Sequence, residues 1–329
     1  MALYPNGNSI REVFDAFNHI KVLVIGDSMI DTYISGTVDR MSPEAPVPIL
    51  NVQEEAHRLG GAANVALNLQ SLGAEVFLAS IVGDDSNSDL FKNLLTDSGL
   101  SADYILNLED RPTTQKKRVM TGSKHLLRMD HEVDLPISRQ QSEKFFATID
   151  HKIAEVNVVV VEDYDKGLLG EWLIDQVIQT ASRSKVPVCV DPKFRNFKSY
   201  RGVDLLKPNL KEFHVAIGCR PENLESSVEQ LRKEMEIGSL MLTMGAQGIF
   251  FCSDTYSKRH PVIERSISDV SGAGDTVIAI ASLTYIMGLA PNIISELSNL
   301  GGGIVCQSPG VVPVSKSRLL EEAEKAGLI

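Results

Sequence analysis

Short, nearly continuous apolar runs alternate along the chain with segments whose apolar residues recur at helical spacing. The apolar runs are typical of strands buried on both faces, and they lie at residues 21–26, 76–82, 104–106, 158–161, 187–190, 204–206, 239–243 and 248–252. The segments with helical spacing lie at residues 10–19, 60–72, 86–98, 138–156, 169–182, 210–217, 224–235, from 272 onward, 292–307 and 316–326. This alternation predicts an α/β fold, a three-layer sandwich with helices on both faces of a mostly parallel central sheet.

Residues 33–50 depart from this alternation. The segment carries prolines at positions 43, 46 and 48, so it does not suit a central strand, and we interpret it as an edge ribbon standing off the main sheet. Residues 113–119 and 125–129 predict a hairpin around Thr121-Gly122. The two segments, about 33–50 and 113–129, are predicted to form a small β lid. Since no repeat, linker or low-complexity tract divides the chain, we expect residues 1–329 to form a single domain.

Composition and charge narrow the class of protein. Of the 329 residues, 43% are hydrophobic and 23% are charged, which is ordinary for a soluble globular protein. The formal net charge of −11 disfavours nucleic acid and anionic membranes as partners. The four cysteines are isolated, so we expect reduced thiols and no structural zinc site. Because the sequence shows no signal peptide and no membrane-spanning run, it predicts a cytoplasmic protein.

The most informative turn is Gly272-Ala273-Gly274, which leads directly into an apolar helix. Backbone N–H groups at a helix start lack partners, and together with the helix dipole they attract anions. Asp275 places a carboxylate beside this turn. A cradle for negative charge next to a base suits transfer of a phosphoryl group to an alcohol. The alternative is a glycine turn whose aspartate only caps the helix.

Two common nucleotide-binding signatures are missing from the chain. No G-x-x-x-x-G-K-[ST] sequence occurs, which excludes a P-loop enzyme. The Gly272-Ala273-Gly274 turn lacks the third glycine of a dinucleotide site and lies deep in the C-terminal half, which argues against a dehydrogenase.

Two motifs resemble those of the ribokinase-like (phosphofructokinase-B type) carbohydrate kinases: LGGAANVA at residues 59–66 and DVSGAGDT at residues 269–276, in the order that the family has. Within the family, the chain resembles the kinases of bacterial heptose biosynthesis, which phosphorylate D-glycero-D-manno-heptose 7-phosphate at the anomeric hydroxyl to supply ADP-heptose for lipopolysaccharide. Supporting stretches are SPEAPVP at 42–48, PTTQKKR at 112–118, DYDKG at 163–167 and LKPNLKE at 206–212. The resemblance runs from about residue 21 to residue 319 and implies a ribokinase-like fold, with ATP and magnesium.

The resemblance implies roles for residues at matching positions. Asp275 would be the catalytic base, and the N–H groups of Gly272, Ala273 and Gly274 would stabilise charge on the transferring group. The substrate-binding residues would be Asp31, Gly60, Gly61, Asn64, Lys116, Arg118, Asp163, Lys166 and Lys193. Carboxylate and amide groups suit sugar hydroxyls, and the basic side chains suit a phosphate. The basic residues also have a simpler interpretation as solvated surface charges.

The same resemblance implies a nucleotide site, lined by Gly272 and Gly274 together with Asn209, Glu212, Thr243, Gly245, Asn299 and Gly302. Since magnesium keeps several of its waters, we expect Glu212 to act on it through water. A glutamate in the first turn of a helix is otherwise a capping partner. Asp269 matches a position that helps to bind a monovalent cation, so potassium is a further expected ion.

We therefore expect an ATP- and Mg²⁺-dependent sugar kinase, with heptose 7-phosphate as the first candidate substrate. Residues 162–165 (EDYD) and 194–196 (FRN) depart from the heptose kinase pattern. Kinases of ribose, fructose or fructose 6-phosphate therefore stay open, as does a catalytically silent sugar- or nucleotide-binding regulatory protein. The His-x-Gly-His motif of a nucleotidyltransferase is absent, which predicts a kinase-only form. Exposed strand edges of the lid favour a homodimer.

Overall fold

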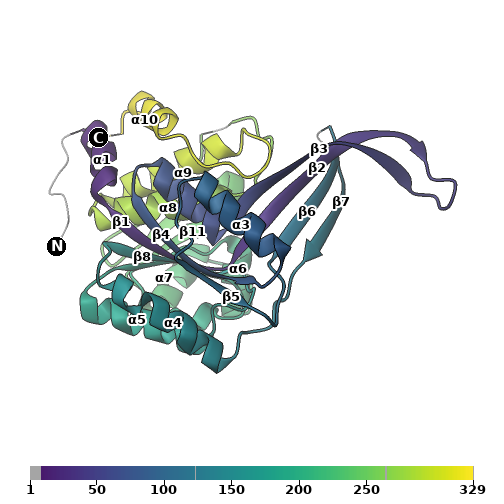
Figure 1. The fold of residues 1–329 in the computed structure, drawn as a ribbon. Coiled ribbons are helices and arrows are strands. Elements are labelled where there is room, and N and C mark those ends of the chain that lie inside the picture. Colours follow the sequence, from purple (N-terminus) through teal and green to yellow (C-terminus); the bar gives the residue numbers. More distant parts are fainter. Residues whose placement is uncertain (1–8, 123, 264, 329) are drawn as a thin grey trace.

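A large sheet runs through the centre of the part of the chain that the structure, a computed structural model, describes: residues 9–122, 124–263 and 265–328 (Figure 1). Over these residues nine strands form it, in the order β13-β12-β11-β10-β9-β8-β1-β4-β5. Neighbours from β5 to β11 pair in parallel, and β12 and β13 add antiparallel pairs at the other edge. The bounds are β1 (Lys21–Gly26), β4 (Glu75–Gly83), β5 (Tyr104–Leu108), β8 (Val158–Glu162), β9 (Val188–Asp191), β10 (Leu205–Leu206), β11 (Ser239–Thr243), β12 (Ile249–Cys252) and β13 (Ser257–His260).

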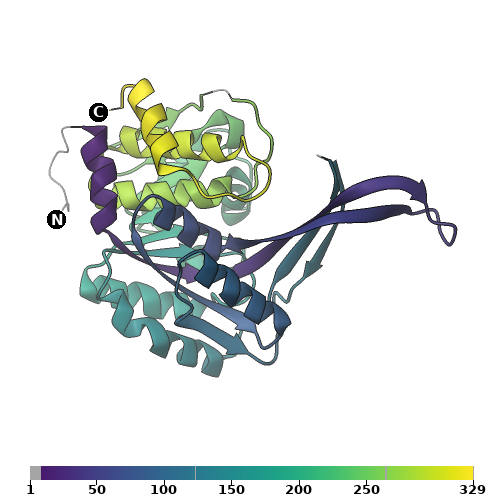
Figure 2. The same ribbon diagram turned by 45° about the horizontal axis from the view of Figure 1, so that its top comes forward.

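Helices cover both faces of this sheet (Figures 1 and 2). One face packs against α1 (Ile10–Ala16), α2 (Ala62–Ser71), α3 (Ser86–Asp97), α8 (Ala273–Ile286), α9 (Pro291–Val305) and α10 (Lys316–Lys325). The other packs against α4 (Arg139–Ile153), α5 (Glu171–Ser184), α6 (Leu210–Ile217) and α7 (Leu224–Glu234). Single 3₁₀ turns are η1 (Phe17–His19), η2 (Phe197–Ser199) and η3 (Gly245–Gln247). In β1, Val22 and Val24 enter the first core and Leu23 and Ile25 the second, which is why residues 22–25 form a continuous apolar run.

A smaller sheet, which we call the lid sheet, stands off the body and has the order β3-β2-β6-β7 over the described residues. Its strands are β2 (Ser28–Met41), β3 (Pro48–Gly61), β6 (Gln115–Thr121) and β7 (Lys124–His131). The hairpins β2–β3 and β6–β7 are antiparallel, and β2 pairs with β6 in parallel. The tip of the β2–β3 hairpin projects far from the body (Figure 2). Pro43 and Pro46 lie at that tip, where they interrupt no strand ladder.

The predicted α/β fold with a mostly parallel sheet is confirmed, and two details differ. The lid sheet reaches beyond residues 33–50, because β2 starts at Ser28 and β3 continues through Gly60 and Gly61. Those glycines therefore end a strand, whereas we expected them to open α2. The sequence analysis also missed β13, a short and largely exposed edge strand with the polar sequence SKRH.

The carboxyl ends of the parallel strands meet along one rim of the large sheet. Asp27 follows β1, Asp163 follows β8, Asp191 ends β9, Lys207 follows β10 and Thr243 ends β11. Ligands of open α/β sheets bind at such a rim, and most predicted site residues gather there or on the adjoining lid sheet.

Candidate active site

Asp275 lies in the first turn of α8, where side chains from two other segments hold its buried carboxylate. Asn64 of α2 donates from Nδ2 to Asp275 Oδ2 over 2.6 Å, and the Tyr164 hydroxyl donates to Oδ1 over 2.8 Å. Burial raises the pKa of Asp275, whereas these two hydrogen bonds and the charge of Lys207 oppose the rise. The carboxylate is thus held by α2 and by the loop after β8, at the start of a helix that has no side-chain cap.

Of the two glycines in the turn, Gly272 is required by what surrounds it. Gly272 has a φ of 77°, and a Cβ there would lie 2.9 Å from Asn64 Nδ2. A Cβ on Gly274 would lie 3.6 Å from Lys207 Nζ and 3.7 Å from Asp191 Oδ2. A side chain at position 272 would therefore be strained and would press on the donor to Asp275. At position 274, a Cβ would make only ordinary van der Waals contacts with a charged pair.

That charged pair joins Lys207 Nζ to Asp191 Oδ2 over 2.6 Å, and both side chains are largely buried. Burial raises the pKa of Asp191 to about 7, although Lys207 opposes the rise. Glu162, at the end of β8, has a pKa raised by burial and then by the negative charges of Asp191 and Asp275. Among the described residues, the buried Oε2 of Glu162 has no hydrogen-bond partner. Neither Lys207 nor Asp191 was assigned to the site from the sequence, although Asp191 is the last residue of β9 and Lys207 comes directly after β10.

Glu212 is engaged at both of its oxygens. Its Oε2 accepts the Asn209 N–H over 2.8 Å, while Asn209 Oδ1 caps α6, so the two residues form a capping box. Its Oε1 pairs with Lys193 Nζ over 2.7 Å. The capping interpretation is therefore confirmed. A direct metal contact at Glu212 would have to replace one of these bonds, so an action through water stays a prediction.

Two further residues predicted for the nucleotide site lie close to Asn209. Thr243 forms an isolated parallel bridge with Asn209, and its N–H donates to the Pro208 carbonyl over 2.9 Å. Gly245 follows in an exposed turn with a φ of 58° and open space where a Cβ would be. Asn209, Thr243 and Gly245 thus form one stretch of the rim.

The remaining nucleotide residues, on α9, make contacts within the protein. Asn299 Nδ2 donates to the His260 carbonyl over 2.9 Å and so ties α9 to β13. A Cβ on Gly301 would lie 2.0 Å from Ile280 Cδ1, and one on Gly302 would lie 3.1 Å from Val277 Cγ2. The glycines let α9 pack closely against α8, so a contact of Asn299 or Gly302 with a nucleotide stays a prediction.

Asp269 anchors the loop that precedes α8. Its Oδ1 accepts the Ser271 N–H and its Oδ2 accepts the Gly310 N–H, each over 2.9 Å. Partial burial acts to raise the pKa of Asp269, but these hydrogen bonds and the charge of Arg118 lower it overall. Asp269 is therefore a stable anion beside the turn.

The residues predicted to bind the sugar, Asp31, Gly60, Gly61 and Arg118, lie where β2, β3 and β6 are neighbours in the lid sheet. Arg118 of β6 donates to the carboxylate of Asp31 on β2 in a largely buried ion pair. A Cβ on Gly60 would lie only 2.3 Å from Asp31 Oδ2, and one on Gly61 only 2.3 Å from the Asp27 carbonyl. The glycine pair thus allows β3 to pass against Asp31 and the end of β1.

The basic residues that we grouped by sequence divide into separate contacts. Lys116 and Lys166 converge on the carboxylate of Glu132, with Nζ–Oε distances of 2.7 and 2.8 Å. Arg118 pairs with Asp31 instead. Lys193 pairs with Glu212 and lies over the ring of Tyr164, with Nζ 5.2 Å from the ring centroid. The structure therefore brings together Lys116 and Lys166 and places Lys193 in another group.

Asp163 and Tyr164 differ in where their side chains lie. Asp163 is buried, its Oδ2 accepts the Tyr200 hydroxyl over 2.7 Å, and burial raises its pKa to about 6. Its Oδ1 accepts the Asp165 N–H within the same loop. Asp163 thus organises the loop, and a contact with substrate stays a prediction. Tyr164, which the sequence analysis did not assign, is the residue that reaches Asp275.

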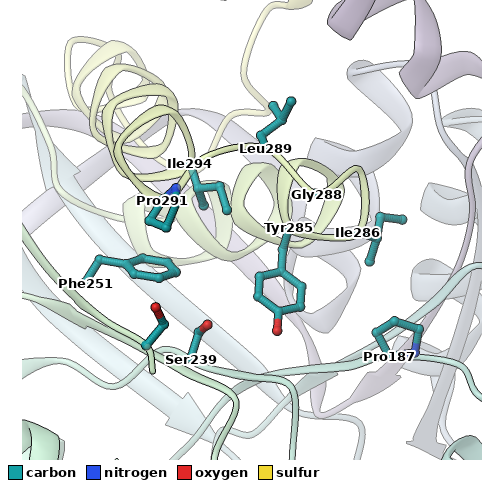
Figure 3. A pocket seen from close by; sticks show the side chains of 10 residues that line it. Pro187, Ser239, Phe251, Tyr285, Ile286, Gly288, Leu289, Pro291 and Ile294 are labelled. Carbon is teal, nitrogen blue, oxygen red and sulfur yellow. The ribbon is translucent and has the colours of Figure 1, made fainter. Parts of the chain in front are cut away.

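A cavity of about 360 Å³ lies away from these residues (Figure 3). Phe251, Tyr285, Pro291 and Ile294 line it, where α8 ends and α9 begins. No predicted site residue contributes to its wall. The cavity is therefore at the opposite end of α8 from Asp275.

The described residues contain neither a helix that could span a membrane nor a preformed cluster of metal ligands. Within the described ranges, no helix is both long and apolar enough to cross a bilayer. In the same residues, no group of three or more His, Cys, Asp and Glu side chains is arranged to hold a metal ion.

Comparison with known proteins identifies relatives over nearly the whole chain. A family model described as pfkB family carbohydrate kinase matches residues 19–317. The "Bifunctional protein HldE" of a Nitratiruptor species is 38% identical over 310 residues, which cover 93% of this chain and 64% of the relative. That of Ectopseudomonas mendocina is 37% identical over 313 residues, with 94% and 65% covered. The chain thus spans less than two thirds of the length of these relatives.

Solved structures with the same fold include phosphofructokinase-2 from Escherichia coli in complex with potassium, which matches with a TM-score of 0.76. The two sequences are 14% identical, and the match covers 94% of this chain and 99% of that chain. Arabidopsis thaliana ribokinase, complexed with ribose and ATP, has a TM-score of 0.71, 18% identity, and coverages of 92% and 99%. At these identities the likeness establishes a ribokinase-like fold and nothing further.

Proposed function

Because the chain belongs to the pfkB family of carbohydrate kinases, we propose that it transfers the γ-phosphoryl group of ATP to the anomeric hydroxyl of D-glycero-D-manno-heptose 7-phosphate. Transfer of a phosphoryl group to a hydroxyl is supported above all by one observation, the buried Asp275 carboxylate beside the uncapped start of α8. The relatives named HldE and the convergence of Lys116 and Lys166 support a phosphorylated sugar as the acceptor.

Asp275 acts as the general base in this proposal. The sugar hydroxyl oxygen attacks the γ-phosphorus, the bond from that phosphorus to the oxygen retained by ADP breaks, and the hydroxyl proton passes to Asp275. Hydrogen bonds from Asn64 and Tyr164 keep the carboxylate oriented before the substrate arrives. The N–H groups of Gly272 and Gly274 would face the charge that develops on the transferring group. The Ala273 N–H donates to the Val270 carbonyl over 3.3 Å and would have to give up that contact to join them.

The chain's own residues fit a magnesium–nucleotide complex. Magnesium, when bound, neutralises charge on the nucleotide phosphates. Glu162 offers a buried carboxylate oxygen without a hydrogen-bond partner in the described residues, close enough to Asp191 for their charges to interact. Since no three carboxylates of the described residues are arranged to ligate a metal, Glu212 and these carboxylates would contact the ion through its water molecules, and the nucleotide phosphates would supply direct ligands. Each oxygen of Asp269 accepts one N–H and keeps a further lone pair for a monovalent cation such as potassium.

The lid sheet is proposed to cover the sugar and exclude water, which limits wasteful ATP hydrolysis. We also propose a cytoplasmic homodimer that pairs through the lid sheets. Apolar side chains exposed on this sheet, including Met41, Val52 and Leu127, support pairing. Analytical ultracentrifugation at micromolar concentration is expected to show a dimer, and a monomer alone would contradict this part of the proposal.

The proposed reaction is tested by measuring ADP release against a panel of free and phosphorylated sugars. We expect turnover with phosphorylated sugars, highest with heptose 7-phosphate. Preference for free ribose or fructose would overturn the heptose assignment. No turnover with any sugar, in a sample that binds ATP, would favour a silent binding protein on this fold.

A further inference from the structure

One carboxylate joins the lid sheet to the body of the protein. Glu132 Oε2 lies 2.7 Å from Lys116 Nζ, and Glu132 Oε1 lies 2.8 Å from Lys166 Nζ. The three side chains are only partly buried, with 14%, 19% and 22% of Lys116, Lys166 and Glu132 exposed. We call this arrangement the lysine–glutamate bridge. Solvent reaches it, so its pairs can exchange.

The two lysines come from segments that the fold fixes independently. Lys116 lies on β6 in register with Asp31 of β2. Lys166 lies in the loop after β8, whose backbone N–H groups at Tyr164, Lys166 and Leu168 all donate to the buried Asp27 carboxylate. The lysines therefore keep their places whether or not Glu132 lies between them.

Glu132 itself is held near the lysines by backbone contacts of its neighbours. It directly follows β7, and Arg111 Nη2 donates to both the Val133 carbonyl and the Lys166 carbonyl, over 3.0 and 2.7 Å. Arg111 thus ties the segment after β7 to the loop after β8. The side chain of Glu132, in contrast, is bound through its two lysine partners and can leave when another anion takes its place.

The bridge has the geometry of a bound phosphate. A carboxylate that gives one oxygen to each of two ammonium groups presents the same pattern as two oxygens of a phosphate. We propose that Glu132 occupies the place of the substrate's phosphate in the free enzyme, and that the phosphate displaces it to bind Lys116 and Lys166. This inference rests on the proposed function, since it concerns how the sugar kinase recognises a phosphorylated acceptor.

The loop after β8 also connects the proposed phosphate site to the proposed catalytic base, Asp275. Tyr164 of this loop donates to Asp275, and Lys166 two residues later carries the bridge. A sugar with its hydroxyl at Asp275 and its phosphate at Lys166 would therefore follow one loop. A free sugar has no anion to displace Glu132, so the bridge selects against it.

The Lys193–Glu212 pair differs from the lysine–glutamate bridge in how firmly its carboxylate is held. Glu212 is 1% exposed and its second oxygen caps Asn209, so no ligand can displace it at low cost. Glu132, in contrast, caps no helix, because its two carboxylate oxygens both accept hydrogen bonds from the lysines. The exchangeable carboxylate is therefore Glu132.

The test measures binding of inorganic phosphate by isothermal titration calorimetry. Removing the charge of Glu132 in Glu132→Gln is expected to tighten phosphate binding about tenfold, since the ion pairs of Glu132 with Lys166 and Lys116 are both released. Lys116 keeps a longer pair with Asp130, whose Oδ2 lies 3.3 Å from its Nζ. Adding Lys166→Met in the double variant is expected to abolish that gain, which separates this site from phosphate bound at the start of α8. Glu155→Gln, which removes an exposed partner of Lys152, is the matched control and is expected to change nothing.

Unchanged or weaker phosphate binding in Glu132→Gln would overturn the inference, as would a gain that survives Lys166→Met. Circular dichroism of each variant confirms that it is folded. Because the titration needs no turnover, it judges Glu132 even if no sugar in the panel is phosphorylated. That second failure would instead contradict the proposed function.

Discussion

The start of α8 and the lid sheet both carry opposite charges at short distance, yet they hold them differently. Around Asp275 the groups are buried: Lys207 is 2% exposed and pairs with Asp191 across 2.6 Å. On the lid sheet, Lys116 pairs with Glu132 at a partly exposed site. A buried pair resists exchange because an unpaired buried charge is costly, whereas an exposed pair is weak. The reacting end of the site is thus fixed in advance, whereas the lysine–glutamate bridge is left exchangeable. The Arg118–Asp31 pair of the lid sheet is buried like the pair of Lys207.

The largest expected effect tests this difference in stability. Lys207→Met leaves Asp191 without its buried partner and is expected to lower the free energy of unfolding by about 3–5 kcal/mol. Lys116→Met on the lid sheet is expected to cost less than about 1 kcal/mol. Urea unfolding followed by circular dichroism measures both. Equal losses would show that the two regions hold charge in the same way.

A second expected effect concerns the proposed sugar-binding residues on β2 and β3, where the close packing of Gly60 against Asp31 limits which side chains fit. A Cβ on Gly60 would lie 2.3 Å from Asp31 Oδ2, so Gly60→Ala must move that carboxylate. We expect KM for the sugar to rise about tenfold to a hundredfold, as for a misfit of roughly 1–3 kcal/mol, with kcat little changed. Gly170→Ala, with open space at its Cβ, is the control. A normal KM in Gly60→Ala would remove Asp31 from substrate binding.

The smallest expected effect is a shift in the pH profile. The Tyr164 hydroxyl favours the charged form of Asp275 and so lowers its pKa, in opposition to burial. Tyr164→Phe should raise that pKa, and since the base must be deprotonated, the acid limb of kcat/KM should move up by about one pH unit. Tyr285→Phe, near the other end of α8, should leave the limb in place. An unmoved limb in Tyr164→Phe would mean that the hydroxyl does not tune the base.

Much of the fold could be predicted because it depends on local pattern. After the exposed Lys21, the strand β1 is apolar because it is buried on both faces, and helix α6 was predicted at its observed bounds because its capping box is local. The strand β13 could not be predicted, since an exposed edge strand with the sequence SKRH carries no hydrophobic signal. The outer parts of β2 and β3 fell within the predicted ribbon, but their ends next to the body were missed. Residues 28–32 of β2 are all buried and come one residue after β1, and β3 ends in a glycine pair that also suits a helix start, so neither end shows the alternation of an edge strand.

The candidate site was predictable where one short segment forms it. The Gly272-Ala273-Gly274-Asp275 turn is such a segment. Partners that come from distant segments were not predictable: nothing in the sequence indicates that Tyr164 rather than Asp163 reaches Asp275. The division of the lysines has the same cause, since the partner of each comes from another part of the fold.

The most direct test of the central claim is the rate of phosphoryl transfer in Asp275→Asn. The amide keeps the size of the side chain and cannot accept the proton, so we expect kcat to fall about a thousandfold or more, while ATP binding measured by calorimetry stays within about twofold. Asp97→Asn, on an exposed position of α3, is the control. A near-normal kcat in Asp275→Asn would contradict the assignment of Asp275 as the base and, with it, the account of the site.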